Sequence, residues 1–349
     1  MSGLVKVLGS LIVPGLAASY AAAHLGLPSR TLSFLASLCG LLCHLRMLVQ
    51  GGHAIDRRYR KRVDLSGRVC LVTGATVGGL GHEAAKMFSK MGATVVLTVR
   101  SEAKGAEAVA ALGGNGRASF VVVDFLSAAS IRAGAATVLK RHPRLDVLVL
   151  NAGVGGMAPT DEAWMANHVG PFLWTQLLSP VLEATARAHG DTRIVAVSSH
   201  AHAGSHIDYA APYDRVKQKP DDEVAYGQSK LAQIMHMRAL QARLRAKAGL
   251  GGDRAIRCLA VSPGVAFTNI MAFIPPLFRP LCWLLFRSPE MGAQVIAMAA
   301  IDEAVPGGSF LTNCQVERSH GVGDCSNQPA EWDKLWALSE KCAADGRFP

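Results

Sequence analysis

The chain has 349 residues, of which 50% are hydrophobic and only 18% are charged, and its formal net charge is +10. This length suits one large α/β domain with an appendage. The eight cysteines are scattered without a Cys-x-x-Cys pair or zinc-ligand spacing, which gives no support to a metal site and favours a reducing compartment.

The first fifty residues are apolar enough to attach the chain to a membrane. Residues 3–27 carry Lys6 as their one charged residue, and residues 31–49 carry Arg46. Because a helix of roughly 20 apolar residues spans a bilayer, we expect residues 1–50 to form one or two anchoring helices. A cleaved signal peptide and a buried soluble helix pair are the alternatives.

A basic cluster follows the apolar segment, and it consists of Arg57, Arg58, Arg60, Lys61 and Arg62. No basic stripe with interleaved aromatic residues accompanies it, so we expect no nucleic-acid partner. Residues 51–65 are better explained as a juxtamembrane linker, which the positive-inside rule places on the cytosolic side with the domain that follows.

From residue 66 to residue 349, short apolar runs alternate with helical segments such as residues 82–90. The expected strands are residues 68–72, 93–99, 120–123, 145–150, 193–197, 258–261 and 309–311. Buried runs in this alternation are typical of a parallel sheet covered on both faces. The pattern predicts a single doubly wound α/β domain.

A glycine-rich loop lies between the first strand and the first helix, in the stretch Thr73-Gly74-Ala75-Thr76-Val77-Gly78-Gly79-Leu80-Gly81. Glycines at this place let the backbone approach a pyrophosphate at the helix N-terminus. The loop predicts a dinucleotide site of the Rossmann type, with cofactor-binding residues Gly74, Gly78, Gly79, Leu80 and Gly81.

The second strand ends at Arg100. An acidic residue there would bind the ribose 2′-hydroxyl of NAD, whereas an arginine suits the 2′-phosphate of NADP. Arg100 therefore favours NADP over NAD, with a solvated strand-end charge as the alternative interpretation.

Tyr226 and Lys230 stand four residues apart, so a helix would place them on one face. An ammonium beside a phenol favours the phenolate and lowers the tyrosine pKa. Such a phenol can exchange a proton with an alcohol or carbonyl oxygen. The alternative is a surface tyrosine beside a solvated lysine.

Further polar signals follow the predicted strands, where open α/β sheets bind ligands. They are Asp124 after the third strand, Asn151-Ala152-Gly153 after the fourth, Ser198-Ser199 after the fifth and Pro263-Gly264 after the sixth. Asn167 begins a helix.

In this order, the motifs resemble the short-chain dehydrogenase/reductase family over about residues 66–340. Within the family the chain is most similar to the retinol dehydrogenase-like branch. That likeness rests on residues 167–173, Ala201-His202, and residues 225–232, 292–294 and 335–340.

The resemblance implies a catalytic role for four residues. Tyr226 would be the general acid in reduction and the base in oxidation, and Lys230 would hold the nicotinamide ribose and keep Tyr226 acidic. Ser199 would hydrogen-bond the substrate oxygen, and Asn167 would support a water relay toward Lys230.

The resemblance also implies cofactor contacts beyond the glycine loop. Asp124 would meet the adenine ring, and Asn151 would steady the cofactor region. Pro263 and Gly264 would join the cofactor site, and Thr268 would contact the nicotinamide amide.

One departure from the family pattern concerns the glycine loop, which is one residue longer between Gly74 and Gly79. The longer loop puts cofactor affinity in question and leaves a non-catalytic dinucleotide-binding scaffold or redox sensor as the alternative function. His200, His202 and His206 lack a matching carboxylate or cysteine set, so we interpret them as part of a polar substrate-side loop.

Residues 272–286 are apolar and interrupted by prolines, which favours a lid over an apolar substrate or a patch on lipid over an ordinary core helix. We expect a membrane-attached NADP-dependent oxidoreductase acting on a retinoid-like, steroid-like or long-chain aldehyde-like substrate. We place it on the endoplasmic reticulum, facing the cytosol. The exact substrate, the reaction direction and a homodimeric state are left open.

Overall fold

A computed structural model describes residues 63–113, 116–155, 158–210, 222–247, 250, 255–271, 274–279, 282, 286–317 and 324–344. The expected membrane anchor and most of the basic linker lie outside the described residues. Within the described part, no helix has both the length and the apolar character needed to cross a membrane.

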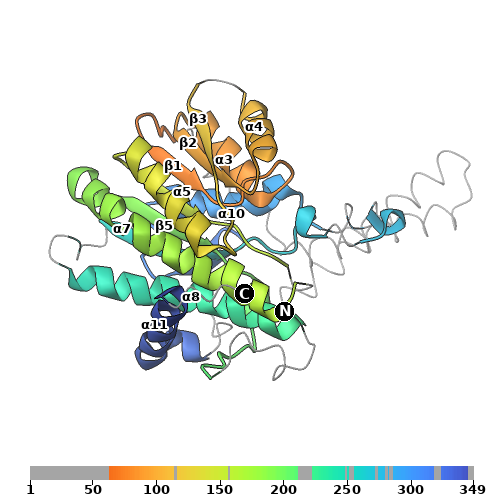
Figure 1. Cartoon of the computed structure of the whole chain (residues 1–349), viewed down its shortest axis with the longest axis vertical. Coiled ribbons are helices and arrows are strands. Elements are labelled where there is room, and N and C mark those ends of the chain that lie inside the picture. The colour runs from red at the N-terminus through yellow and green to blue at the C-terminus, as the bar shows by residue number, and fades with distance from the viewer. Residues whose placement is uncertain are drawn as a thin grey trace, which may run out of the picture.

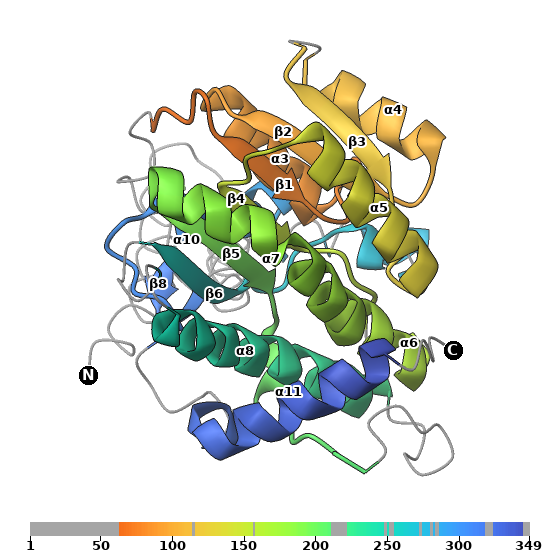
Figure 2. The ribbon, with the colours of Figure 1, turned by 60° about the vertical axis from the view of Figure 1, so that its left-hand side comes forward.

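The described strands form one sheet in the order β3-β2-β1-β4-β5-β6-β7-β8 (Figure 2). Strands β1 to β7 pair in parallel, and β8 runs antiparallel to β7. The strands are β1 (Val69–Val72), β2 (Thr94–Val99), β3 (Ala118–Val122), β4 (Val147–Leu150), β5 (Thr192–Val197), β6 (Ile256–Ser262), β7 (Phe310–Thr312) and β8 (Gln315–Val316).

The predicted parallel sheet is confirmed, and each of its predicted strands is present with boundaries shifted by at most a few residues. Strand β8 was not predicted, so the expectation of a wholly parallel sheet was wrong at this edge. Asn313 and Cys314 both adopt positive φ, 51° and 55°, and this tight turn reverses the chain. A two-residue strand after such a turn has too little hydrophobic pattern to be recognised in sequence.

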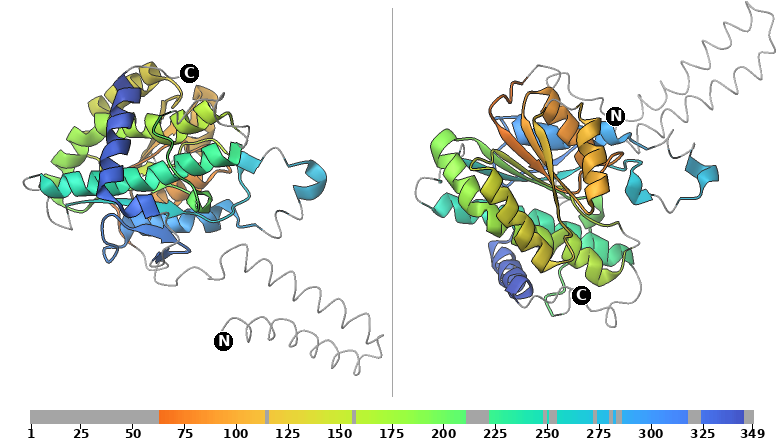
Figure 3. Two further views of the ribbon diagram at one scale, coloured as in Figure 1. Left: turned by 90° about the horizontal axis from the view of Figure 1, so that it is seen from below. Right: turned by 45° about the horizontal axis from the view of Figure 1, so that its top comes forward.

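Helices cover both faces of the sheet, as Figures 1 and 3 show. One apolar core lies under α3, α4 and α10, and the other lies under α5, α7 and α8. The helices are α3 (Leu80–Lys90), α4 (Glu102–Ala111), α5 (Ala128–Arg141), α6 (Thr160–Trp164), α7 (Gly170–His189), α8 (Asp222–Ala246), α10 (Pro289–Ile301) and α11 (Pro329–Ala344). Short turns are the π-helix η2 (Met165–Val169) and the 3₁₀ turns η3 (His200–His202), η4 (Asn269–Met271), η5 (Pro276–Phe278) and η6 (Asp324–Asn327).

Serine side chains start three of these helices. Ser101, Ser127 and Ser288 each accept a hydrogen bond from a backbone N–H in the first turn of α4, α5 and α10. This satisfies a donor that a helix start otherwise leaves unpaired. The caps therefore fix where α4, α5 and α10 begin.

The C-terminal helix α11 packs on the outside of α7 and α8. The Trp336 ring lies edge-on to Phe172 with centroids 5.0 Å apart, and the Arg243 guanidinium stacks 4.2 Å from the Trp336 ring centre. The imidazole Nε2 of His168 lies 2.7 Å from the Ser339 hydroxyl. These contacts tie α11 to α7, to α8 and, through His168, to the π-helix η2 next to Asn167.

Candidate active site

The main cavity, of about 640 Å³, lies where the strand order reverses between β1 and β4. Ligands of open α/β sheets bind at such a switch point, beside the carboxyl ends of the strands. Most of the predicted cofactor residues line this cavity: Gly74, Gly79, Leu80, Arg100, Asp124, Asn151 and Thr268. The cavity therefore unites segments that are almost 200 residues apart.

Two residues of the glycine loop have no room for a side chain because they pack against the segment after β4. Gly74 has φ 64°, and a Cβ there would lie 2.7 Å from the Cα of Ala152. A Cβ on Gly81 would lie 2.4 Å from the side-chain nitrogen of Asn151. Packing therefore requires glycine at both positions. Because Gly74 and Gly79 line the cavity without a side chain, a pyrophosphate bound there would meet their backbone directly.

The additional loop residue is held by a contact that the sequence did not predict. The side-chain amide of Asn269, at the start of η4, donates a hydrogen bond of 3.0 Å to the carbonyl of Val77. Gly78, with φ 80°, turns the chain beside this asparagine. The lengthened loop is therefore held by a residue that follows β6, and Asn269 itself lines the cavity.

Thr73 joins the glycine loop to the segment after β4. Its fully buried hydroxyl donates to the carbonyl of Val149 at 3.2 Å and accepts from the backbone N–H groups of Asn151 and Ala152 at 2.9 Å each. The Asn151 side chain in turn donates to the carbonyls of Thr73 and Gly74. These reciprocal hydrogen bonds hold the Asn151 side chain against the glycine loop.

Tyr226 and Lys230 both lie on α8, and the structure brings them to Ser199 at the end of β5. The Tyr226 and Ser199 side chains are hydrogen-bonded, and the Lys230 ammonium lies 5.4 Å from the centre of the Tyr226 ring. Lys230 Nζ donates to the carbonyl of Val197 at 3.0 Å. The helical i, i+4 arrangement predicted from sequence is confirmed.

Burial controls the protonation of this pair. Desolvation lowers the pKa of Lys230 to about 7, and desolvation raises the pKa of Tyr226 although the Ser199 hydrogen bond opposes that shift. Burial therefore sets the net direction of the Tyr226 pKa in this structure, and the lowering of that pKa by Lys230 stays a prediction. Near neutral pH the phenol is protonated and the ammonium can lose its proton.

Asn167 lies within the π-helix η2 rather than at the start of an ordinary helix. Its side chain accepts from the Val154 N–H at 2.8 Å and donates to the Val154 carbonyl and to the Ser229 hydroxyl. Its own carbonyl accepts a hydrogen bond of 2.6 Å from the side-chain amide of Gln233. Single-turn π-helices frequently mark functional sites because they turn a side chain out of the regular ladder.

Some predicted residues have other surroundings. The Pro263 carbonyl accepts from Arg287, and a Cβ on Gly264 would lie 3.0 Å from the same guanidinium, so this pair is packed against Arg287 rather than lining the main cavity. His200 bonds to the Thr312 hydroxyl at 2.8 Å. Sequence reasoning missed Asn269 and Gln233, although the three-residue spacing from Lys230 to Gln233 on one helix was a usable signal.

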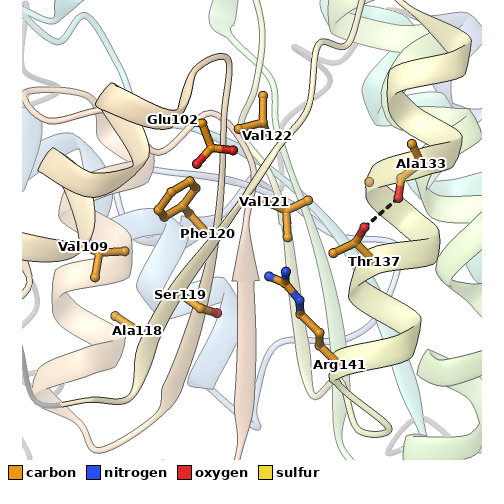
Figure 4. Close-up of a pocket in the computed structure, with 11 residues that line it drawn as sticks. Glu102, Val109, Ala118, Ser119, Phe120, Val121, Val122, Ala133, Thr137 and Arg141 are labelled. Carbon is orange, nitrogen blue, oxygen red and sulfur yellow. Dashed lines mark hydrogen bonds between the residues drawn. The ribbon is translucent and has the colours of Figure 1, made fainter.

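A second cavity, of about 550 Å³, lies along the edge strand β3 between α4 and α5 (Figure 4). Its lining includes Glu102, Phe120, Thr137 and Arg141, and the Thr137 hydroxyl is engaged by the carbonyl of Ala133. None of the predicted site residues lines it. The predicted cofactor residues therefore lie at the switch point between β1 and β4 and not at this edge of the sheet.

Comparison with known proteins gives the family. Residues 68–276 match the short chain dehydrogenase family. The chain is 35% identical over 301 residues to dehydrogenase/reductase SDR family member 13 of Bos taurus, covering 82% of this chain and 76% of that protein. The chain belongs to the short-chain dehydrogenase/reductase family. It is thus an oxidoreductase acting on alcohol and carbonyl groups, and the family binds NAD or NADP.

Other relatives confirm the retinol dehydrogenase-like branch. Retinol dehydrogenase 13 of Mus musculus is 33% identical over 80% of this chain and 85% of its own length. Polyprenol dehydrogenase of Mus musculus is 34% identical over 78% of this chain and 82% of its own length. A crystal structure of an uncharacterized protein from Mycobacterium paratuberculosis superposes with a TM-score of 0.63 at 28% identity, covering 82% of this chain and 96% of that one.

Proposed function

We propose that this short-chain dehydrogenase/reductase uses NADP to interconvert a lipophilic alcohol and its carbonyl. The observation that carries the proposal is the meeting of Tyr226, Ser199 and Lys230. These residues do not line the main cavity themselves, but the Lys230 ammonium lies next to Gly153, which lines it together with Arg100. We infer that this proton-transfer group and this basic residue serve the same nucleotide.

The protein side of the reaction follows from the protonation states. Tyr226 keeps its proton at neutral pH because burial raises its pKa, so its phenol can donate to a carbonyl oxygen. The Ser199 hydroxyl, already hydrogen-bonded to that phenol, orients the same oxygen. NADP, when bound, supplies or accepts the hydride. Lys230 holds the positive charge that favours loss of the phenolic proton in the reverse direction.

The choice of NADP rests on the end of β2. Arg100 is exposed, follows Val99 directly and lines the cavity together with Lys104 of α4. A guanidinium binds a phosphate through two parallel hydrogen bonds. Arg100→Asp should therefore lower kcat/KM with NADPH by roughly 10–100-fold, the value of a charge-assisted hydrogen bond, and should spare kcat/KM with NADH. Arg132→Asp, on an exposed arginine of α5 outside the cavity, is the matched control.

The lipophilic substrate class rests on exposed apolar side chains in the segment that follows β6. Leu277 in η5 is 83% exposed and Val265 is 41% exposed, and both follow β6. The η5 segment projects from the body of the domain in two views (Figures 1 and 3). Two relatives are named for retinol and polyprenol, which are apolar alcohols. A substrate drawn from lipid accounts for an exposed apolar tip of this kind.

A membrane would be the partner of this tip and of the N-terminal segment. We propose that residues 1–50 anchor the protein to the endoplasmic reticulum with the catalytic domain in the cytosol, and that Leu277 touches the same bilayer. Leu277→Asp should reduce the binding of the full chain to phosphatidylcholine vesicles, whereas Leu139→Asp on α5 should not. Equal vesicle binding of both variants would show that Leu277 does not contact the bilayer. Unchanged vesicle binding after deletion of residues 1–50 would show that this segment is not an anchor.

The decisive test of the function uses the purified full-length chain with a panel of retinoid, steroid and long-chain aldehyde substrates and both cofactors. We expect turnover of at least one class with NADPH, and a loss of about 10²-fold to 10⁴-fold for Tyr226→Phe with unchanged NADPH binding. NADPH binding without turnover of any substrate would favour the scaffold alternative instead.

A further inference from the structure

Gln233 is the buried residue that connects the two halves of the proton-transfer site. It lies on α8, three residues after Lys230, and only 2% of its surface is exposed. Its Oε1 accepts a hydrogen bond of 3.2 Å from Lys230 Nζ, and its Nε2 donates one of 2.6 Å to the carbonyl of Asn167. Both ends of one side-chain amide are therefore engaged by proposed catalytic residues.

The chemistry of the partners determines the orientation of the amide. An ammonium can only donate and a backbone carbonyl can only accept, so Oε1 must face Lys230 and Nε2 must face Asn167. Rotating the amide by 180° would lose both hydrogen bonds. The Asn167 end is rigid because the asparagine side chain is held by Val154 and Ser229. Gln233 therefore holds the Lys230 ammonium at a fixed position relative to Asn167.

The lysine needs this acceptor because it is buried. Lys230 has three N–H donors, of which one is directed to Val197 and one to Gln233. Among the residues that the structure describes, these are the acceptors of Lys230, so the third donor would be available to a ligand such as the nicotinamide ribose. A neutral acceptor supports the ammonium without the opposite charge of a carboxylate, which would hold the proton permanently.

We propose that Gln233 is a positioning residue of this enzyme, which holds the Lys230 ammonium in place between Asn167 and Tyr226. The inference rests on the proposed function of these three residues. Gln233 would act through Lys230 and would touch neither substrate nor cofactor.

Other titratable groups on the surrounding elements do not take over this task. His168 of η2, His236 of α8 and His200 of η3 all have pKa values lowered mainly by burial, so they carry no positive charge at neutral pH. Tyr226 is protonated under the same conditions. The charge of Lys230 therefore depends on burial and on its two acceptors.

The test compares Gln233→Met with Gln241→Met in the full-length protein. Gln241 is a matched control because it is also a buried glutamine of α8, 3% exposed, with both amide ends bonded, to Cys258 and Ile256, far along the helix from Lys230. Methionine has nearly the length of glutamine, so neither variant leaves a large hole. Gln233→Asn, which keeps the amide one methylene shorter, is the milder second variant.

The expected signature is a change of protonation rather than a general loss of folding. For Gln233→Met we expect kcat to fall on the order of 10²-fold, as for a misplaced catalytic group, at unchanged thermal stability relative to Gln241→Met. Without its acceptor the ammonium is less stable, so the lysine pKa falls and the phenolate is less favoured. The pH–rate profile for alcohol oxidation should then move about one unit toward alkaline pH. Gln233→Asn should shift it in the same direction by less.

A second measurement does not need turnover. In protein labelled with ¹³C at lysine Cε, the Lys230 resonance, assigned with Lys230→Met, should titrate near pH 7 in the wild type and in Gln241→Met, and about one unit lower in Gln233→Met. A Lys230 midpoint that is the same in all three proteins would overturn the inference even if the wild type is active. Absence of turnover with the shifted midpoint would instead contradict the proposed function alone.

Discussion

Replacing Thr73 by valine tests the connection between the glycine loop and the rest of the cavity. The change keeps the volume and branching of the side chain and removes only the hydroxyl. That hydroxyl serves three backbone groups: the Val149 carbonyl and the N–H groups of Asn151 and Ala152. With valine, two N–H donors at the cavity wall lose their acceptor.

The magnitude follows from the cost of unpaired buried donors, about 1–3 kcal/mol each. We expect Thr73→Val to lower the free energy of unfolding by about 2–4 kcal/mol, since part of Asn151 is accessible and water can restore one bond. The Tm should fall by roughly 5–15 °C. Because Asn151 then loses its fixed position, the Kd for NADPH should rise by about tenfold, or roughly 1.4 kcal/mol.

Thr175→Val is the matched control. Thr175 is also fully buried, but its hydroxyl donates only to the Pro171 carbonyl one turn earlier in α7. Its loss leaves no N–H donor unpaired, so we expect the free energy of unfolding to fall by at most about 1 kcal/mol and the NADPH affinity to stay unchanged. Urea unfolding and fluorescence titration with NADPH measure both quantities. If Thr73→Val were no less stable than Thr175→Val, the hydroxyl bridge would not support the site and the reasoning would be refuted.

Three further predictions concern the base of the sheet and the cofactor loop. Burial alone would raise the pKa of Asp191, but the Arg193 hydrogen bond and nearby arginine charges lower it overall. Asp191→Asn should therefore lower the free energy of unfolding by about 2–3 kcal/mol at pH 7. Urea unfolding at a series of pH values should show this difference vanishing as the pH falls through the lowered pKa of the folded state. Asn269→Ala should raise the NADPH Kd about three- to tenfold by calorimetry, because it releases the brace on the glycine loop; an unchanged Kd would show that the loop holds itself. Gly81→Ala would place a Cβ 2.4 Å from the Asn151 amide, so NADPH titration should show binding weakened by more than tenfold while the fold persists.

Local patterns were sufficient to predict the parallel strands, because each is a short apolar run bounded by a turn or by polar residues, and burial on both faces demands that composition. The order of catalytic motifs likewise identified the family before any coordinates. Strand β8 escaped prediction because two residues after a left-handed turn carry no periodic signal.

The amino-acid sequence by itself determined the doubly wound domain, the glycine loop and the Tyr226–Lys230 pair, because these depend on chain-local spacing. The tertiary structure decided the properties that depend on surroundings. Burial raised the Tyr226 pKa, an effect of the surroundings that the i, i+4 spacing does not contain. Contacts between distant segments placed Asn269 on the glycine loop and put the Asn167 carbonyl within reach of Gln233. Desolvation and long-range hydrogen bonds arise only when the chain is packed, so no spacing along the sequence encodes them directly.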